Sequence, residues 1–155
     1  MRRAVCPGSY DPITVGHEDI VRRARALFGR VEVVVMNNRE KEYLFSLEER
    51  YAMACAAFEG EEGIEVYSSE GMLYDYLRGK DAVLVKGVRD EKDFLYERNC
   101  AVFNFEHSGV ETLYLDSSAA LRTLSSTVVR DKIEKKESLK GLVSEKVVKL
   151  LRNKL

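Results

Sequence analysis

The segment from residue 7 to residue 17 carries the side chains best suited to chemistry. Its sequence is PGSYDPITVGH, so two glycines, a serine and a histidine stand just before an apolar pattern with helical spacing. Gly8 and Gly16 permit a close approach of the backbone, and the free N–H groups of a first helical turn, where His17 falls, attract phosphate. This segment therefore predicts a nucleotide phosphate site. The alternative is an ordinary turn with a capping histidine.

Cationic and hydroxyl residues recur in three later segments. Lys41 precedes FSLEER, Lys86 and Arg89 lie within KGVRD, and the hydroxyl-rich run LSSTVVR ends at Arg130. Each has an ordinary alternative, because a lysine in a polar loop is usually solvated and a serine at a helix start is usually a cap. Brought together with His17, the cations would offset the repulsion between two anionic substrates. Positioning and charge stabilisation of this kind usually catalyse phosphoryl transfer.

These loops require a framework, and the apolar pattern predicts one of alternating strands and helices. Strands are expected at residues 2–6, 31–36, 64–67, 82–85 and 112–115. The first helix should end at Gly29 and the second should open with the capping box Ser46–Glu49. Further helices are expected around residues 72–79, 90–106, 125–136 and 142–153. The alternation predicts an α/β fold with a Rossmann-like, doubly wound parallel five-stranded sheet, helices on both faces and ligands at the carboxyl ends of the strands.

The composition fits one globular domain spanning residues 1–155, since 45% of the residues are hydrophobic and 33% are charged. Lysine and arginine number 25 against 26 aspartate and glutamate, so neither nucleic acid nor a membrane surface is an expected partner. The N-terminus lacks the apolar region of a signal peptide, which predicts a cytoplasmic protein. Three cysteines without metal-type spacing are expected to be buried, reduced thiols.

Thr14-Val15-Gly16-His17 resembles the (T/H)-x-G-H motif of the nucleotidyltransferase superfamily, and its longer context PGSYDPITVGHEDIV resembles the form found in bacterial-type phosphopantetheine adenylyltransferases. The three later segments are similar to further motifs of that family, in the same order, so the resemblance spans residues 4–130. The rest of the chain matches only in being helical. The resemblance implies transfer of AMP from ATP to 4′-phosphopantetheine in coenzyme A biosynthesis. The products would be dephospho-coenzyme A and pyrophosphate, formed by direct in-line attack without a covalent enzyme intermediate.

The same resemblance implies roles for individual residues. His17 would stabilise the transition state at the α-phosphorus of ATP. The residues implied in ATP binding are Ser9, Tyr10, His17, Gly87, Val88, Arg89, Glu97, Leu121, Arg122, Thr123, Leu124, Ser125, Ser126 and Thr127. Those implied in binding 4′-phosphopantetheine are Ser9, Lys41, Leu73 and Lys86, although the residue type of Leu73 alone suggests the core. Lys86 stands where most relatives carry arginine, so charge is kept but bidentate hydrogen bonding is lost.

Two other functions remain open on the sequence. A related nucleotidyltransferase would act on nicotinamide mononucleotide or use CTP, but the segments around Lys41 and from Arg89 to Glu97 favour 4′-phosphopantetheine and ATP. A non-catalytic nucleotide-binding module would keep the fold without turnover, and the retention of Ser9, His17, Lys41 and Arg89 argues against it.

The cofactor and the remaining partners follow from substrate chemistry and from the resemblance. The sequence shows no carboxylate cage for a metal, so no metal-ligating residue is expected, and Mg²⁺ is expected to arrive with ATP, bound by phosphates and water. The resemblance also implies a homohexamer, with feedback inhibition by coenzyme A bound in the active site.

Overall fold

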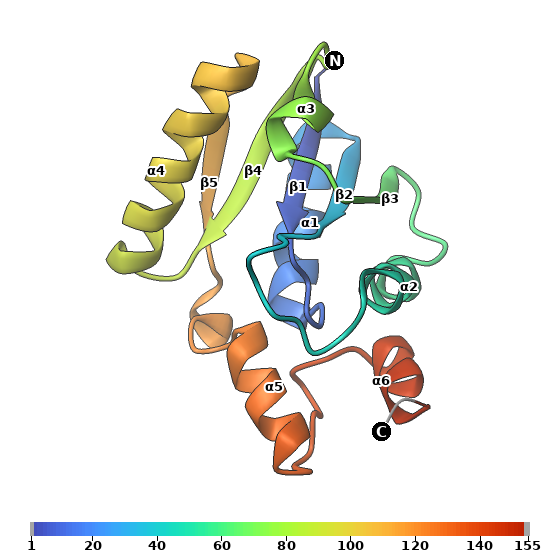
Figure 1. Cartoon of the computed structure of the whole chain (residues 1–155). Helices are drawn as coiled ribbons and strands as arrows, with labels where there is room; N and C mark the ends of the chain where they lie inside the picture. The colour runs from blue at the N-terminus through green and yellow to red at the C-terminus, as the bar shows by residue number, and fades with distance from the viewer. Residues whose placement is uncertain (1, 154–155) are drawn as a thin grey trace.

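The computed structural model describes residues 2–153, which form a parallel sheet with helices on both faces (Figure 1). Within this range the strands are β1 (Arg3–Gly8), β2 (Val31–Met36), β3 (Ile64–Ser69), β4 (Ala82–Val88) and β5 (Thr112–Asp116). The helices are α1 (Val15–Phe28), α2 (Leu47–Ala57), α3 (Leu73–Leu77), α4 (Glu91–Ser108), α5 (Ser126–Glu134) and α6 (Glu145–Arg152), with a 3-10 turn at Ala119–Leu121. The predicted fold class is confirmed.

The strands are ordered β3-β2-β1-β4-β5, and every neighbouring pair is parallel. The chain builds outward from β1 to β3 and then returns to the other side of β1 to add β4 and β5. The strand order thus reverses between β1 and β4. Ligands of doubly wound sheets bind in the crevice at the carboxyl ends of the strands beside such a reversal. The topology alone therefore marks the ends of β1 and β4 as the place to look for a site.

The two faces of the sheet bury different side chains, because successive residues of a strand point to opposite faces. Ala4 and Cys6 of β1 belong to the larger apolar core, to which α1, α2, α5 and α6 also contribute. Val5, between them, belongs to a smaller core with Leu77 of α3 and Val110. Helix α4 packs against β4 and α3. Burial from both sides explains why the central strands read as continuous apolar runs.

Four strands extend beyond their predicted ends, and β1 and β4 do so beside the reversal of strand order. β1 runs to Gly8 and β4 runs to Val88, because their ladders with β2 and β5 continue to these last residues. The prediction stopped at proline, lysine and glycine, whose strand preference is weak, but pairing with neighbouring strands outweighs that preference. Lys86 and Gly87 therefore belong to the end of a strand and not to the loop after it.

Helix ends follow the sequence where the signals are strong. α1 ends at Gly29, whose φ of 76° is left-handed, and α2 opens with the predicted capping box of Ser46 and Glu49. α3, α5 and α6 are shorter than predicted, β3 is longer, and the 3-10 turn at Ala119–Leu121 was not predicted. Strong caps thus located helix ends, while apolar spacing alone did not.

Gly87 allows α1 to pack closely on β4. A Cβ at this position would lie 2.8 Å from Cγ1 and 3.0 Å from Cδ1 of Ile20, on the facing side of α1. Gly87→Ala is therefore expected to destabilise the fold by about 1–3 kcal/mol through overpacking, measured by urea denaturation. Gly71→Ala is the matched control, because the nearest atom to its added Cβ is Oγ of Ser69 at 3.9 Å. Equal stability of the two variants would contradict this role for Gly87.

The cysteines and the helices test two further expectations. All three cysteines are free; Cys6 is buried as predicted, whereas Cys55 and Cys100 are only partly buried, so that part of the prediction was wrong. None of the helices in residues 2–153 combines the length with the apolar composition that spanning a bilayer requires.

Candidate active site

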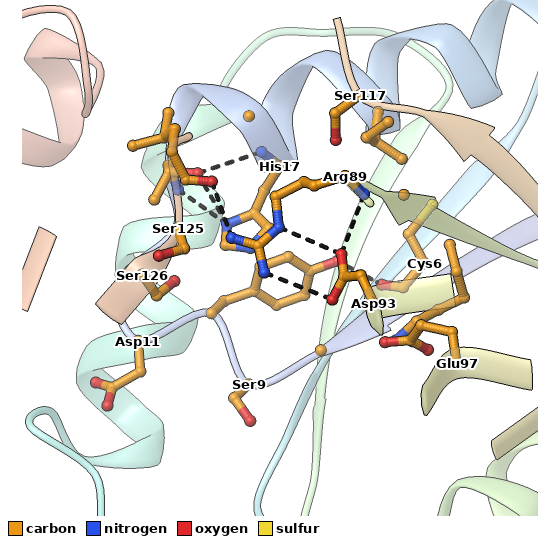
Figure 2. Close-up of a pocket in the computed structure, with 18 of the residues that line it drawn as sticks. Cys6, Ser9, Asp11, His17, Arg89, Asp93, Glu97, Ser117, Ser125 and Ser126 are labelled. Atoms are coloured by element: carbon orange, nitrogen blue, oxygen red, sulfur yellow. Dashed lines mark hydrogen bonds and ion pairs between the residues drawn. The ribbon is translucent and has the colours of Figure 1, made fainter. Parts of the chain in front are cut away.

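A cavity of about 420 Å³ opens at the carboxyl ends of β1 and β4, where the strand order reverses (Figure 2). Its volume lies in the range of small-molecule sites. The loop between β1 and α1, the end of β4, the first turns of α4 and the start of α5 all contribute to it. The predicted residues that line it are Ser9, Tyr10, His17, Lys41, Lys86, Gly87, Arg89, Glu97, Leu121, Leu124, Ser125, Ser126 and Thr127. Residues far apart in the sequence therefore meet here.

His17 lies in the first turn of α1 and forms a reciprocal cap with Thr14. The backbone N–H of Thr14 donates to Nδ1 of His17 at 3.0 Å, and the backbone N–H of His17 donates to Oγ1 of Thr14 at 3.3 Å. A ring nitrogen that accepts a hydrogen bond carries no proton, so we infer that the neutral ring is protonated on Nε2. His17 therefore keeps one N–H donor for a ligand.

The surroundings of His17 keep its ring neutral. Burial lowers the pKa of His17, and the positive charges of Lys86 and Arg89 lower it further, to about 4. At neutral pH the uncharged ring can therefore donate a hydrogen bond through Nε2–H, but it does not carry the second ring proton that an imidazolium could transfer. Such a group suits the stabilisation of negative charge that develops on a bound phosphate.

Tyr10 shapes the loop that leads to His17. Its backbone is left-handed, with a φ of 49°, and its buried hydroxyl donates to the carbonyl of Cys6 at 2.8 Å. A Cβ on Gly8 would lie 3.2 Å from the Tyr10 ring, so this glycine makes room for the ring as well as for a ligand. The same ring meets His17 edge-on, with centroids 5.0 Å apart. Tyr10 therefore packs the histidine in place.

Two of the cations that the sequence predicted for the site, Lys86 and Arg89, are paired with carboxylates. Nζ of Lys86 lies 3.2 Å from Oε2 of Glu97, so the glutamate predicted to face the nucleotide contacts a predicted substrate-binding lysine. Nε of Arg89 donates to Oδ2 of Asp93 at 3.2 Å, and Nη1 of Arg89 donates to the carbonyl of Leu124 at 3.4 Å. These partners hold both cations at the rim of the cavity before any anion binds.

Lys41 lies in the exposed loop between β2 and α2 and reaches the cavity from there. Its Nζ is 5.7 Å from the centre of the Tyr43 ring, a cation–π contact. The hydroxyl of Tyr43 is 3.5 Å from Oγ of Ser9, on the β1–α1 loop. Tyr43 thus connects the lysine with the serine predicted to touch both substrates.

The hydroxyls at the start of α5 face the same cavity. Ser125 is the N-cap, and its Oγ accepts the backbone N–H of Val128 at 3.2 Å. Oγ of Ser126 donates to the carbonyl of Pro12 at 2.9 Å, and Oγ1 of Thr127 accepts from Arg130 at 3.1 Å. The start of α5, with its free N–H groups, is thereby fastened beside the β1–α1 loop, where both could bind one polyphosphate.

Comparison with known proteins decides which family this geometry belongs to. Residues 5–132 match the model of the cytidylyltransferase-like family. A phosphopantetheine adenylyltransferase from Clostridium novyi is 40% identical over 157 residues, covering 100% of this chain and 98% of the relative. Another from Renibacterium salmoninarum is 44% identical over 149 residues, covering 95% of this chain and 91% of the relative. The chain belongs to the phosphopantetheine adenylyltransferase family.

Membership of this family makes the chain an enzyme of the nucleotidyltransferase class, as the four motifs predicted. The relatives do not favour the alternative of a nicotinamide mononucleotide enzyme or of a non-catalytic module. The similarity also extends past the motifs, because the match to the Clostridium novyi relative covers 100% of the chain, including the C-terminal helices.

Four residues that the family resemblance implied do not line the cavity. Val88 is buried at the end of β4, where its carbonyl accepts from the backbone N–H of Ser117 at 2.8 Å. Arg122 and Thr123 are exposed just before α5, and Leu73 packs against the smaller core. Their binding roles stay predictions, and for Leu73 the structure agrees with what its residue type alone suggested.

Asp11, Asp93 and Arg130 also line the cavity and were not predicted as site residues. Asp93 lies within the segment from Arg89 to Glu97 that resembles the family, and its spacing of four residues from Arg89 was the signal that could have paired them. Asp11 is buried, and its partners come from the loop after β2, so no local pattern reveals its role.

Thr14→Val is expected to cost about 1 kcal/mol of stability, because it removes the N-cap oxygen of α1. It should also lower kcat, because the turn that orients the His17 ring loosens. The loss should be smaller than that caused by removing the ring, because Nδ1 still accepts the backbone N–H of residue 14. Urea denaturation and steady-state kinetics measure the two effects. Thr14→Ser keeps the hydroxyl and should restore both; a kcat that is unchanged in Thr14→Val would show that the cap does not orient His17.

Proposed function

We propose that this protein transfers AMP from ATP to 4′-phosphopantetheine, giving dephospho-coenzyme A and pyrophosphate. The observation that carries the proposal is the meeting of His17, Lys41, Lys86 and Arg89 in one cavity at the strand reversal. The names of the relatives support the same substrates. Two anionic molecules can approach each other only where cations offset their repulsion, and this cavity supplies those cations.

The proposed reaction is a single in-line displacement. A phosphate oxygen of 4′-phosphopantetheine attacks the α-phosphorus of ATP, the bond from that phosphorus to the bridging oxygen breaks, and pyrophosphate leaves with the electron pair. The Nε2–H of His17 donates to the α-phosphate oxygens as their charge grows. Arg89 and the start of α5 hold the departing phosphates, while Lys41 and Lys86 orient the attacking phosphate.

Magnesium enters this proposal through the nucleotide. The structure shows no group of three or more potential metal ligands among residues 2–153. The carboxylates that line the cavity are already engaged: Asp11 by backbone N–H groups, Asp93 by Arg89 and Glu97 by Lys86. We therefore propose no direct ligand to a metal among these residues. Mg²⁺ bound by phosphates and water would supply charge neutralisation of the polyphosphate.

Pyrophosphate release by the purified protein tests the proposal. ATP and Mg²⁺ would be combined with 4′-phosphopantetheine, with nicotinamide mononucleotide or with no acceptor, and CTP would replace ATP as the alternative donor. We expect release only with ATP and 4′-phosphopantetheine. Release with another pair of substrates would leave the assignment of the site in place but contradict the proposed substrates. No release in any mixture would contradict the proposed activity.

We also propose that coenzyme A inhibits the enzyme. A separate proposal is that the enzyme works in the cytoplasm. Coenzyme A carries both the pantetheine arm and an adenine nucleotide, so it resembles the two substrates joined together and should compete with each. The cytoplasm is where ATP would be supplied. Inhibition of pyrophosphate release by coenzyme A that higher substrate concentrations relieve is the expected result; unchanged rates at saturating coenzyme A would contradict it.

A homohexamer is part of the same proposal, and the outer face of α4 supports self-association. Exposed apolar and aromatic side chains are concentrated on this helix, namely Phe94, Leu95, Tyr96, Val102, Phe103 and Phe105, and Leu113 of the adjacent β5 is exposed as well. Monomeric proteins rarely leave so continuous an apolar surface in contact with water. The α4 surface therefore suits burial against a second copy of the chain.

The double variant Val102→Glu and Phe105→Glu is expected to sediment as a smaller species than the wild type. Two buried charges without partners at an interface cost several kcal/mol, enough to dissociate most assemblies. Analytical ultracentrifugation measures the mass. Leu27→Glu, an equally drastic change at an exposed residue of α1, is the control and should leave the mass unchanged. An unchanged mass in the double variant would remove α4 from the interface.

A further inference from the structure

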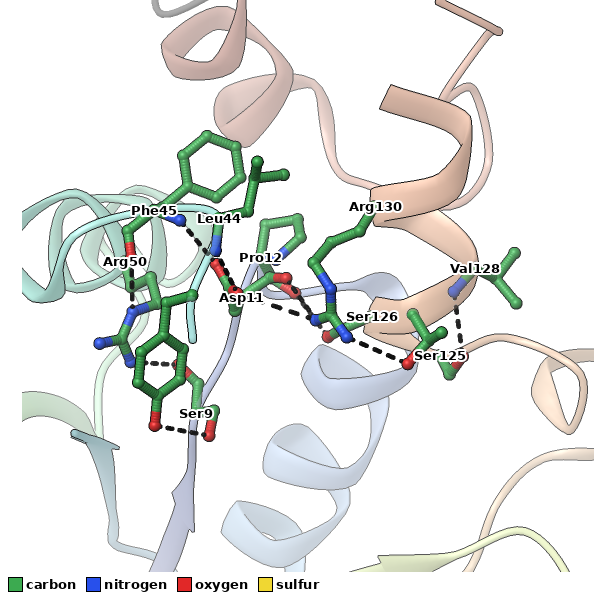
Figure 3. A network of polar contacts seen from close by, with 12 residues as sticks. Ser9, Asp11, Pro12, Leu44, Phe45, Arg50, Ser125, Ser126, Val128 and Arg130 are labelled. Atoms are coloured by element: carbon green, nitrogen blue, oxygen red, sulfur yellow. Dashed lines mark hydrogen bonds and ion pairs between the residues drawn. The ribbon is translucent and has the colours of Figure 1, made fainter. Parts of the chain in front are cut away.

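The backbone of Phe45 is held on both sides by charged residues from different elements (Figure 3). Its N–H donates to Oδ1 of Asp11 at 3.0 Å, and the N–H of Leu44 donates to Oδ2 of the same carboxylate at 2.9 Å. Its carbonyl accepts from Nε of Arg50 at 3.1 Å. Asp11 and Arg50 together form a clamp on Phe45. This clamp fixes the C-terminal end of the exposed loop that carries Lys41.

Arg50 is the centre of the clamp. Its side chain is 0% exposed, and Nη1 donates both to the carbonyl of Ser9 at 2.9 Å and to that of Met36 at 2.8 Å. Nη2 donates to Oδ1 of Asn37 at 2.6 Å, and the guanidinium lies 3.8 Å from the centre of the Tyr43 ring. One planar donor fork thus joins the loop after β1, the end of β2 and the Lys41 loop.

Asp11 extends the same network to α5. Nη1 of Arg130 donates to the backbone carbonyl of Asp11 at 2.9 Å and lies 3.9 Å from its Oδ2. Oγ of Ser126 donates to the carbonyl of Pro12 next to it. Asp11 therefore contacts both the start of α5 and the C-terminal end of the Lys41 loop.

The Lys41 loop has little else to hold it. Residues 38–42 are exposed, so the loop cannot position itself by packing into the core. Its fixed points are the buried Phe45 and the contacts of Tyr43, whose hydroxyl accepts the N–H of Asn38 at 2.8 Å and lies 3.5 Å from Oγ of Ser9. Without the clamp, the loop would keep its internal hydrogen bonds and the long contact between Tyr43 and Ser9, but it would lose its bonds to Asp11 and Arg50.

We propose that Arg50 and Asp11 are positioning residues that set the distance between Lys41 and the loop of Ser9 and His17, and so align the attacking phosphate with ATP. This inference rests on the proposed function, in which Lys41 holds the acceptor. Neither residue need touch a reacting atom. Their effect reaches the reaction through the loop, and misplacement of a reacting group by about 1 Å can cost roughly 10²-fold in rate.

Arg50→Lys and Asp11→Asn are the test variants. Lysine keeps the charge but cannot reach four acceptors, and asparagine keeps the shape but leaves one of two N–H groups unpaired. We expect kcat/KM for 4′-phosphopantetheine to fall about 10- to 100-fold, through a lower kcat and a higher KM for that substrate, while the KM for ATP changes much less. Hydrogen–deuterium exchange of residues 37–45 in the substrate-free protein should become faster in both variants.

Glu32→Gln is the matched control, because it also alters a buried ionic group. Glu32 lies near the amino end of β2, where it contacts Arg3 and Lys80, far from the carboxyl ends that form the cavity. It should lower stability while leaving both KM values and exchange in residues 37–45 unchanged. If Arg50→Lys and Asp11→Asn behave like Glu32→Gln, the two residues serve the fold alone and the proposal fails.

The two readouts separate this proposal from the proposed function. If the wild type releases no pyrophosphate, the proposed function is wrong. Hydrogen–deuterium exchange then still shows whether the clamp orders the Lys41 loop. Unchanged exchange in both variants overturns the clamp even if the wild type is fully active.

Discussion

His17→Ala is expected to lower kcat by roughly 10²- to 10³-fold while the protein stays folded, the usual effect of removing one donor to developing negative charge. The ring is held by Thr14 and packed by Tyr10, and it keeps one N–H for the cavity. Because the donor acts mainly on the transition state, KM values should change less than kcat. Steady-state kinetics and far-UV circular dichroism measure activity and folding.

His17→Asn is the matched control for this prediction, because an amide also offers an N–H donor. It should recover part of the lost rate, whereas alanine should not. A near-normal kcat in His17→Ala would overturn the assigned role, and an equal loss in both variants would mean that the position of the donor matters more than its presence.

The pH dependence gives a second check on His17. Because the pKa of His17 is lowered to about 4, the ring takes up its second proton only in acid near that pH. The ring should therefore stay neutral throughout the range in which a solvated histidine titrates. We therefore expect no inflection from His17 in the profile of kcat near about pH 6.5. An acid limb near that pH that disappears in His17→Asn would show that the ring titrates in the enzyme.

Local patterns pointed to residues that share one cavity, because each motif of the candidate site is a contiguous segment. Three short segments contain residue types that indicate phosphate binding: the loop before His17, the segment with Arg89 and the start of α5. The structure brings these segments to one cavity. The parallel five-stranded sheet was predicted from the alternation of apolar runs and helices, whereas the order of its strands is known only from the structure. What was missed depends on contacts between distant segments.

Arg50 shows why those contacts escape prediction. In FSLEER it follows a capping box near a helix start, where an arginine is normally solvated. Its burial follows from acceptors in the loop after β1, at the end of β2 and in the loop between β2 and α2, which only the folded sheet brings together. Asp11 is similar, because an acid beside a site for anions has no evident purpose until its N–H partners at Leu44 and Phe45 are seen.

Arg89→Ala is expected to lower kcat/KM for ATP by about 10- to 100-fold, since charge-assisted hydrogen bonds contribute about 1.5–3 kcal/mol each. Asp93 and the carbonyl of Leu124 already orient the guanidinium, so little ordering remains when phosphate binds. The KM for 4′-phosphopantetheine should change less, because Lys41 and Lys86 are the cations proposed for that substrate. Kinetics at saturating acceptor, with calorimetric titration of ATP, measure the effect.

The controls for Arg89 separate charge from geometry. Arg89→Lys keeps the charge without the planar fork and should fall between wild type and alanine. Asp93→Asn keeps Arg89 but loosens its orientation, so its loss should be smaller still. Removing the Arg89 charge also removes one cause of the low pKa of His17, so that pKa should rise toward its ordinary value and the acid limb of the kcat profile should move to higher pH. An unchanged affinity for ATP in Arg89→Ala would assign the phosphates to the start of α5 alone.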